Sequence, residues 1–191
     1  MKALSNKIAL STVVTTLIIL VVSVLLAGVV TMYAVNITST RTQQEDLRLS
    51  KQVVWVNVTG DYSYAALTID NVGGRDVVID KIQVRGVETS WSNVAYLRLD
   101  SPVSGSLLAP NSSYASSLPS TDFEYVSGTT GDFSTASSDI PLASGDTLVI
   151  YIKNPDSISS SDIGTTVGIT VFTESAQYYV ECNVQTSEEA S

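Results

Sequence analysis

Leu17-Ile-Ile-Leu-Val-Val-Ser-Val-Leu-Leu-Ala-Gly-Val-Val30 is the centre of an apolar run over residues 8–35, with no charge between Lys7 and Arg41. The run is longer than the ~20 residues that cross a bilayer as a helix. It is also longer than the roughly 7–15-residue apolar core of a signal peptide. We therefore predict an N-terminal hydrophobic helix that needs lipid or other copies of itself around it.

The predicted helix continues beyond the apolar run. No Gly or Pro occurs from Val29 to Val58, and residues 43–51 have an acceptable helical composition. We expect one helix over residues 4–51, with a polar extension, on the order of 70 Å long at ~1.5 Å per residue. That length favours a helix that packs beside its copies. The alternative is a membrane anchor followed by a short amphipathic stalk.

The rest of the chain has the composition of strands and turns. Val, Ile, Thr and Tyr occur in short runs broken by Gly, Pro, Asn and Asp, and Leu148, Ile150 and Ile152 alternate with other residues. Seven to nine such runs predict a two-sheet antiparallel sandwich over residues 52–191. The expected fold class is α+β, with one long N-terminal hydrophobic helix followed by an antiparallel Ig-like β-sandwich.

Three segments between the strands carry specific expectations. Asp70-Asn-Val-Gly-Gly-Arg-Asp76 predicts a β-hairpin, with glycines at positive φ. Asn154-Pro155 ends a strand, because proline cannot donate to a β-ladder. The Ser-, Gly- and Thr-rich segment 101–138 has few apolar anchors and is expected to be an exposed loop.

Charge is distributed unevenly. From Thr42 onward seven Lys and Arg stand against nineteen Asp and Glu, a net charge of −12. An acidic domain repels phosphate backbones, so no nucleic-acid partner is expected. Lys2 and Lys7 precede the apolar run, which predicts a cytoplasmic N-terminus and an external β domain.

The sequence contains little that points to catalysis. Histidine is absent, and Cys182 is the sole cysteine, on the same predicted strand face as Tyr178, Val180 and Val184. There is no Gly-rich phosphate loop and no cysteine cluster. We expect no enzyme activity, no catalytic or metal-binding residues, and no cofactor. Trp55 and Trp91 are interpreted as core or sheet-packing aromatics.

Three sequons are candidates for N-glycosylation. They begin at Asn111, Asn57 and Asn36, and none has Pro at its middle position. Asn111 lies in the Ser-rich segment and is the preferred site, whereas Asn36 lies close to the apolar run and is the least favoured.

The N-terminus resembles the class III leader and N-terminal helix of archaeal type IV pilins and archaellins. The resemblance rests on Lys2-Ala3-Leu4-Ser5, which combines a basic residue, a small residue and a Leu-Ser step before the long apolar helix. It implies partners: a prepilin peptidase that cuts before the helix, and pilus assembly machinery. It implies cleavage between Ala3 and Leu4, removing residues 1–3. A cut between Ala9 and Leu10, removing residues 1–9, is the alternative.

The resemblance implies a structural subunit of an extracellular, adhesive pilus-like filament, inserted in the membrane before assembly. The helices would then polymerise into a homopolymeric core and the β domains would form its outer sheath, with a surface ligand unknown. Helix packing is expected at Leu17, Leu20, Val24, Ala27, Gly28 and Thr31. The alternatives are an archaellin of a motility filament and a single-span membrane-anchored surface-binding protein.

Overall fold

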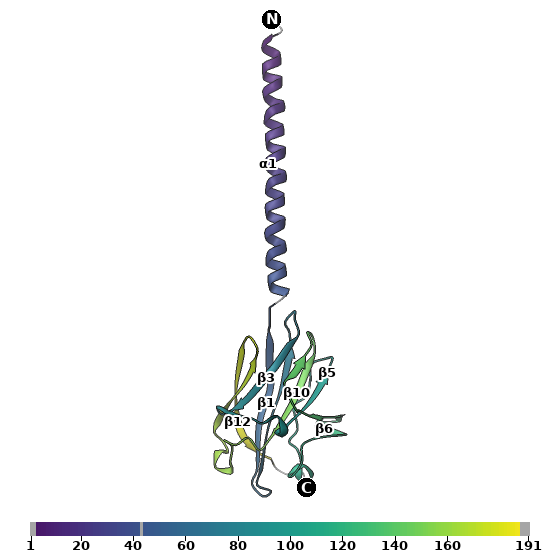
Figure 1. Cartoon of the computed structure of the whole chain (residues 1–191), viewed down its shortest axis with the longest axis vertical. Helices are drawn as coiled ribbons and strands as arrows, with labels where there is room; N and C mark the ends of the chain where they lie inside the picture. Colours follow the sequence, from purple (N-terminus) through teal and green to yellow (C-terminus); the bar gives the residue numbers. More distant parts are fainter. Residues whose placement is uncertain (1–2, 43, 188–191) are drawn as a thin grey trace. The chain divides into compact units, whose positions relative to one another are not determined.

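The structure is a computed structural model of the 191-residue chain. It describes residues 3–42 and 44–187, with side chains described for residues 10–39 and 44–187. The chain divides into two units, Met1–Gln43 and Gln44–Ser191. The first contains the long helix and the second contains the strands (Figure 1).

Helix α1 covers Ala3–Thr42 and therefore ends earlier than the expected residue 51. Instead of a polar helical extension, strand β1 begins at Leu47 and pairs with β2 from Leu47↔Asn71 onward. Leu47 is 5% exposed in the β domain. Burial of this side chain in the sheet overrides the helical propensity of the surrounding polar residues. The β domain consequently begins at residue 44 rather than residue 52.

The β domain contains twelve strands within residues 44–187 and three short 3₁₀ helices. The strands are β1 (Leu47–Asn57), β2 (Tyr62–Asn71), β3 (Val77–Val84), β4 (Val87–Glu88), β5 (Val94–Leu99), β6 (Phe123–Val126), β7 (Thr129–Gly131), β8 (Ser134–Thr135), β9 (Ile140–Leu142), β10 (Thr147–Lys153), β11 (Thr166–Thr173) and β12 (Gln177–Thr186). The 3₁₀ helices are η1 (Trp91–Asn93), η2 (Ser112–Tyr114) and η3 (Ser160–Asp162).

Ten of these strands form one hydrogen-bonded sheet. Its order is β4-β3-β11-β12-β1-β2-β10-β5-β8, with β9 also paired to β3, while β6 and β7 form a separate two-stranded sheet. The pairs are antiparallel except β1 and β12, which run parallel from Val54↔Val184 to Val56↔Thr186. The structure confirms the α+β class. It does not confirm an Ig-like sandwich, because β12 joins β1 to β11 in one continuous sheet.

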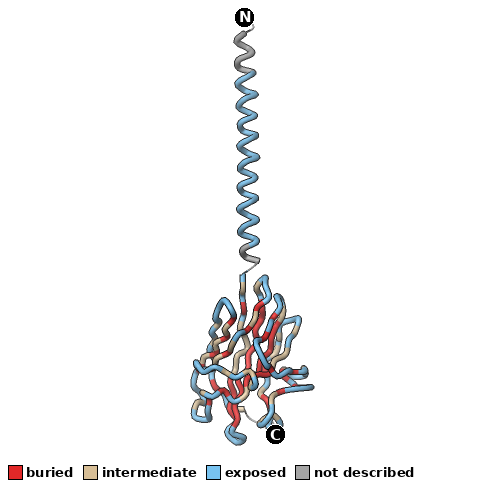
Figure 2. The backbone as a smooth tube through the Cα atoms, viewed as in Figure 1, coloured by how far each residue is buried: buried red, intermediate tan, exposed pale blue. Residues whose placement is uncertain are grey.

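The main core lies between the two halves of this sheet. It brings Leu67 of β2 and Ile150 of β10 into one cluster with Ile82 of β3 and Ile169 of β11. All four residues are at most 1% exposed. Figure 2 shows the buried residues concentrated along these strands. The expected alternation of Leu148, Ile150 and Ile152 is confirmed, since all three lie in this cluster.

A second core covers the opposite face of β1, β2 and β10, and it corrects the expectation for residues 101–138. Phe123 and Phe133 from that segment pack with Tyr64 and Tyr151 of the sheet. Phe123 and Phe133 both meet the Tyr151 ring edge-to-face, with ring centroids 5.1 and 5.4 Å away. The apolar side chains of residues 101–138 therefore cover the sheet, whereas most other residues of this segment are exposed as expected. As a result β2 is buried along its whole length.

The segment from Asp70 to Asp76 is a turn, but the predicted hairpin is wrong. Strand β3 pairs with β11, β4 and β9, and not with β2. The turn therefore carries the chain from one half of the sheet to the other. Gly73 is required here by a close approach, since a Cβ at this position would lie 2.6 Å from the Asp46 nitrogen. The predicted end of a strand before Asn154-Pro155 is confirmed by β10, which ends at Lys153.

Candidate functional site

The most distinctive surface of the chain is the apolar part of α1. Leu10–Ser39 forms a 30-residue span with a mean hydropathy of 2.9, and none of it is buried. All residues of this span are exposed, and Figure 2 colours the helix accordingly. By length and composition this helix can cross a membrane. An N-terminal apolar helix of this kind can anchor in a membrane or act as a signal sequence.

Hydroxyl groups on this helix are hydrogen-bonded within the helix itself. Thr15 donates to the carbonyl of Ser11 at 2.9 Å, and Thr31 donates to the carbonyl of Ala27 at 2.7 Å. Ser23 lies 2.6 Å from the carbonyl of Ile19. These contacts satisfy the hydroxyls locally. The helix can therefore enter an apolar environment without leaving these polar groups unpaired.

The residues predicted to pack between helices lie along one face of α1. Leu17, Leu20, Val24, Gly28 and Thr31 follow one another at intervals of three or four residues, Ala27 precedes Gly28 directly, and all six are exposed. Such spacing places side chains in one row on a helix. No atom lies within 4 Å of a Cβ built at Gly28, so the helix surface is open at this position. The face is available to a partner, while its role in packing stays a prediction.

The candidate leader sites both lie within the backbone of α1. Ala3 and Leu4 are its first two residues, and the alternative pair, Ala9 and Leu10, lies further along the same helix. The side chain of Leu10 is 68% exposed. The side chains of the other three residues are outside the described part of the structure. Cleavage at either position stays a prediction.

The three sequons have different surroundings. Asn111 is exposed and caps η2 by accepting a hydrogen bond from the Ser113 amide at 3.1 Å. Asn57 is 6% exposed, and its side-chain amide donates to the hydroxyl of Tyr62 at 3.2 Å. Asn36 lies in the apolar span of α1. The folded domain thus presents Asn111 to solvent and encloses Asn57.

The first residues of the β domain are held by an arrangement that we call the N-terminal clasp. It consists of residues 44–46, the β2–β3 turn and the β11–β12 hairpin. The amides of Val72 and Gly73 both donate to the Asp46 carbonyl at 3.0 Å. On the other side, Thr173 and Ser175 donate to the carboxylate of Glu45. The backbone at which the helix unit joins the β domain is therefore fixed from residue 44 onward.

Sequence reasoning missed the clasp because residues 43–51 were assigned to the helix. The alternation of Leu47 and Leu49 was the available signal for a strand. Both pack into the main core of the β domain, Leu47 as a buried and Leu49 as a partly buried residue. An interval of two is the period of a strand and not of a helix.

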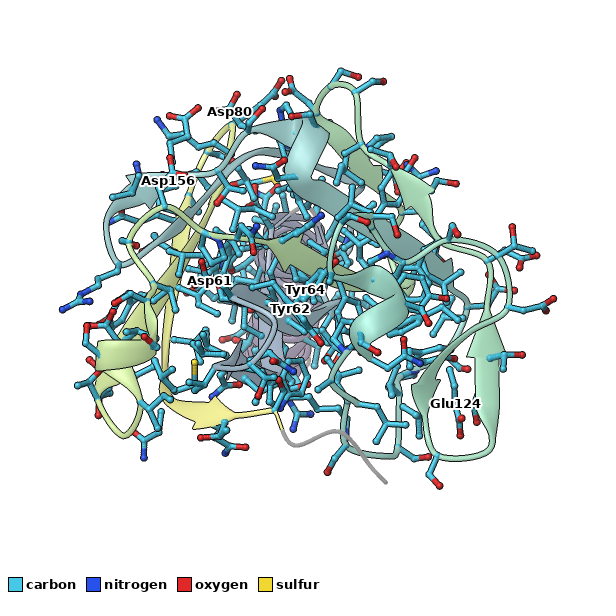
Figure 3. All side chains as sticks on the ribbon, turned by 90° about the horizontal axis from the view of Figure 1, so that it is seen from below. Asp61, Tyr62, Tyr64, Asp80, Glu124 and Asp156 are labelled. Atoms are coloured by element: carbon cyan, nitrogen blue, oxygen red, sulfur yellow. The ribbon has the colours of Figure 1, made fainter. Side chains whose placement is uncertain are left out.

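The acidic residues of the β domain do not gather into a site. Asp156, Asp80 and Glu124 lie at separate places around the domain (Figure 3). Among the residues that the structure describes, no three His, Cys, Asp or Glu side chains are grouped to hold a metal ion. Asp162 has a specific partner, since its carboxylate lies 2.7 Å from the Arg85 guanidinium.

Cys182 has the environment of a packing residue. It is partly buried and lies against the main core together with Tyr178 and Val180, as the period-two pattern predicted. Burial raises the pKa of its thiol to about 11. The thiol is therefore protonated at neutral pH and is a weak nucleophile.

No known protein family model matches this chain, and it has no match among curated proteins. The features of this chain that bear on function are the exposed apolar helix, its internally bonded hydroxyls and the clasp at the start of the β domain.

Proposed function

We propose that this chain is the structural subunit, a pilin, of an archaeal type IV pilus-like extracellular filament with an adhesive role. The proposal is that α1 helices assemble into the filament core and the β domains form its outer sheath. The observation that carries it is the fully exposed 30-residue apolar span of α1. At ~1.5 Å per residue the span is about 45 Å long, against about 30 Å for a bilayer core.

The surface chemistry of α1 supports transfer from lipid to a bundle of helices. Apolar helices gain little from leaving lipid, so close packing and interhelical contacts must favour the bundle. Ala27 and Gly28 provide the small side chains that let two backbones approach closely. The hydroxyls of Thr15, Ser23 and Thr31 bring no unpaired donors into such a contact.

The β domain supports a separation of roles between the two units. Among the residues that the structure describes, both hydrophobic cores of the domain consist of residues from Leu47 onward. The helix is therefore not needed to complete the fold of the domain. This leaves the whole surface of α1 for lipid first and for neighbouring subunits afterwards.

A single-span membrane-anchored surface protein is the second candidate. It is favoured by the same apolar span, since this is long enough to cross a bilayer with some tilt. The two candidates differ in whether the leader is removed and in whether the protein is released by shear.

The test is to shear intact cells, collect the sedimentable filaments and measure the mass of the N-terminal peptide. We expect a peptide that begins at Leu4, with Leu10 as the alternative start. Ala3→Phe should abolish both processing and filaments if the cut follows Ala3, and Ala9→Phe is then the matched control that leaves them intact. An intact leader, found only in detergent-extracted membranes, would contradict the pilin proposal and support the anchored protein.

A further inference from the structure

A pocket of about 270 Å³ lies beside β1, and the proposed function makes no use of it. Three separate segments converge on it: β1, the end of β12 and the cover over the sheet. The lining residues are Lys51, Gln52, Val53, Trp55, Ser106, Leu107 and Gln185. Its volume is just below the usual range for pockets of drug-sized ligands, so it suits one small ligand.

An irregularity in β1 builds this pocket. In a regular strand, consecutive side chains point to opposite faces, yet residues 51, 52 and 53 all line the same pocket. The β1–β2 register shifts between Ser50 and Val53, which marks a β-bulge. Lys51 has a φ of 53° at this bulge. A non-glycine residue in that region is strained, and such strain is concentrated at functional sites.

Hydrogen bonds hold the two polar side chains of the bulge in place. The ammonium of Lys51 donates to the carbonyl of Ser104 at 3.1 Å, and the amide of Gln52 donates to the carbonyl of Glu181 at 3.2 Å. The ammonium group has three donors, so this bond does not exhaust its capacity. Both side chains are thereby preorganised beside the pocket.

The floor of the pocket is rigid and apolar. The ring of Trp55 stacks on Tyr151, with centroids 6.4 Å apart and planes 11° apart. Tyr151 is fully buried and Trp55 is 8% exposed. The lining thus combines an apolar floor with side-chain amides, one hydroxyl and one ammonium. It contains no carboxylate, although the domain is strongly acidic.

We propose that this pocket binds a single acidic sugar ring of the uronic-acid type. The C–H face of the ring fits the floor formed by Trp55 and Leu107, and the ring hydroxyls suit the amides of Gln52 and Gln185. The sugar carboxylate pairs with the ammonium of Lys51 in a charge-assisted hydrogen bond. A neutral sugar lacks this last contact and binds more weakly.

The test is a fluorescence titration of the full-length Trp91→Phe chain in detergent micelles, which leaves Trp55 as the single tryptophan. The probes are methyl glucuronide and, for comparison, methyl glucoside. We expect the glucuronide to change the Trp55 emission with saturation and to bind about tenfold more tightly than the glucoside, because it adds one charge-assisted contact. Equal binding of the two probes, or binding of neither, would overturn the proposal.

Three variants locate the binding at this pocket. Lys51→Gln should weaken glucuronide binding about tenfold and leave glucoside binding little changed. Lys81→Gln is the matched control, since Lys81 of β3 lies over the ring of Phe172 of β11 and is not one of the residues that line the pocket. Gln185→Ala, at an exposed position, should weaken the binding of both probes. It provides a second test if Lys51→Gln does not fold. Unchanged glucuronide binding in a folded Lys51→Gln or Gln185→Ala variant would refute the site.

This titration uses unassembled chains, so its outcome is independent of whether the protein forms filaments.

Discussion

The hydroxyl of Tyr64 on β2 lies 2.6 Å from the carbonyl oxygen of Ser117 in the cover segment. Tyr64 is 1% exposed, and its hydroxyl is also 2.9 Å from the carbonyl of Tyr114. Burial raises the pKa of Tyr64 well above its ordinary value of 10.0, so the hydroxyl stays protonated and can donate. This residue therefore ties the Ser-rich cover to the sheet.

Tyr64→Phe should destabilise the β domain by about 1–2 kcal/mol, because the carbonyls of Tyr114 and Ser117 lose their buried donor. Denaturant unfolding followed by tryptophan fluorescence measures the change. Tyr179→Phe is the control: its ring is 62% exposed and its hydroxyl donates to Glu181 at the surface. Equal losses in the two variants would contradict the anchoring role of Tyr64.

Gly73→Ala should destabilise the β domain by roughly 1–3 kcal/mol, the usual cost of overpacking. The added methyl would lie 2.6 Å from the Asp46 nitrogen and 2.8 Å from the Gln44 oxygen, both of which are backbone atoms. Thermal unfolding by circular dichroism measures the loss. Val72→Ala in the same turn is the control, since Val72 is 58% exposed and should change stability little. A stable Gly73→Ala variant would show that the clasp tolerates a shift of residues 44–46.

Asp162 should give the domain an acid-sensitive contribution to stability. The Ser159 hydroxyl and then the Arg85 guanidinium lower the pKa of its carboxyl from 3.8 to about 2. A lowered pKa in the folded state means that the contribution is complete above pH 3.8 and disappears as the pH falls through about 2. The difference in melting temperature between the wild type and Asp162→Asn should therefore shrink from pH 5 to pH 2. A melting-temperature difference that stays constant from pH 5 to pH 2 would rule out Asp162 as the source of an acid-sensitive contribution to stability.

Salt should stabilise the β domain. Among the described residues, Arg85–Asp162 is the one salt bridge, although the chain from Thr42 onward carries a net charge of −12. Raising the salt concentration from 0.1 to 1 M shortens the Debye length from about 10 to about 3 Å and screens this repulsion. We expect the melting temperature to rise with NaCl, and to rise less in the variant Asp80→Asn/Asp139→Asn. A melting temperature that is independent of salt would show that repulsion among the acidic side chains does not destabilise the domain significantly.

The helix was predictable from composition alone. The sequence from Leu17 to Val30 is apolar on every side, so its conformation does not depend on distant contacts. The end of the helix was not predictable in this way. Leu47 becomes part of a strand because it pairs with Asn71, which is a distant residue in the sequence.

The cover segment was missed for a related reason. Tyr114, Phe123 and Phe133 are separated by irregular polar stretches, so no single strand or helix period connects them. They form one aromatic cluster because the sheet face beneath them is apolar. The sequence indicated that Gly73 is a position that requires glycine, and it predicted a positive φ as the reason. The structure shows a different reason, which is the close approach of the backbone of residues 44–46. The pocket beside β1 depends on a β-bulge at Lys51. No pattern in the sequence predicts this bulge.

In the proposed filament, the place of β1 within the sheet bears on resistance to mechanical load. Tension on the chain at residues 44–46 passes directly into β1, which begins at Leu47. This strand is central, with β2 on one side and β12 on the other. Hydrogen bonds of an antiparallel ladder run across the strand direction, so a pull along β1 loads many of them together instead of peeling them one at a time. The chain thus enters the β domain at a central strand, which is harder to pull out of the sheet than an edge strand.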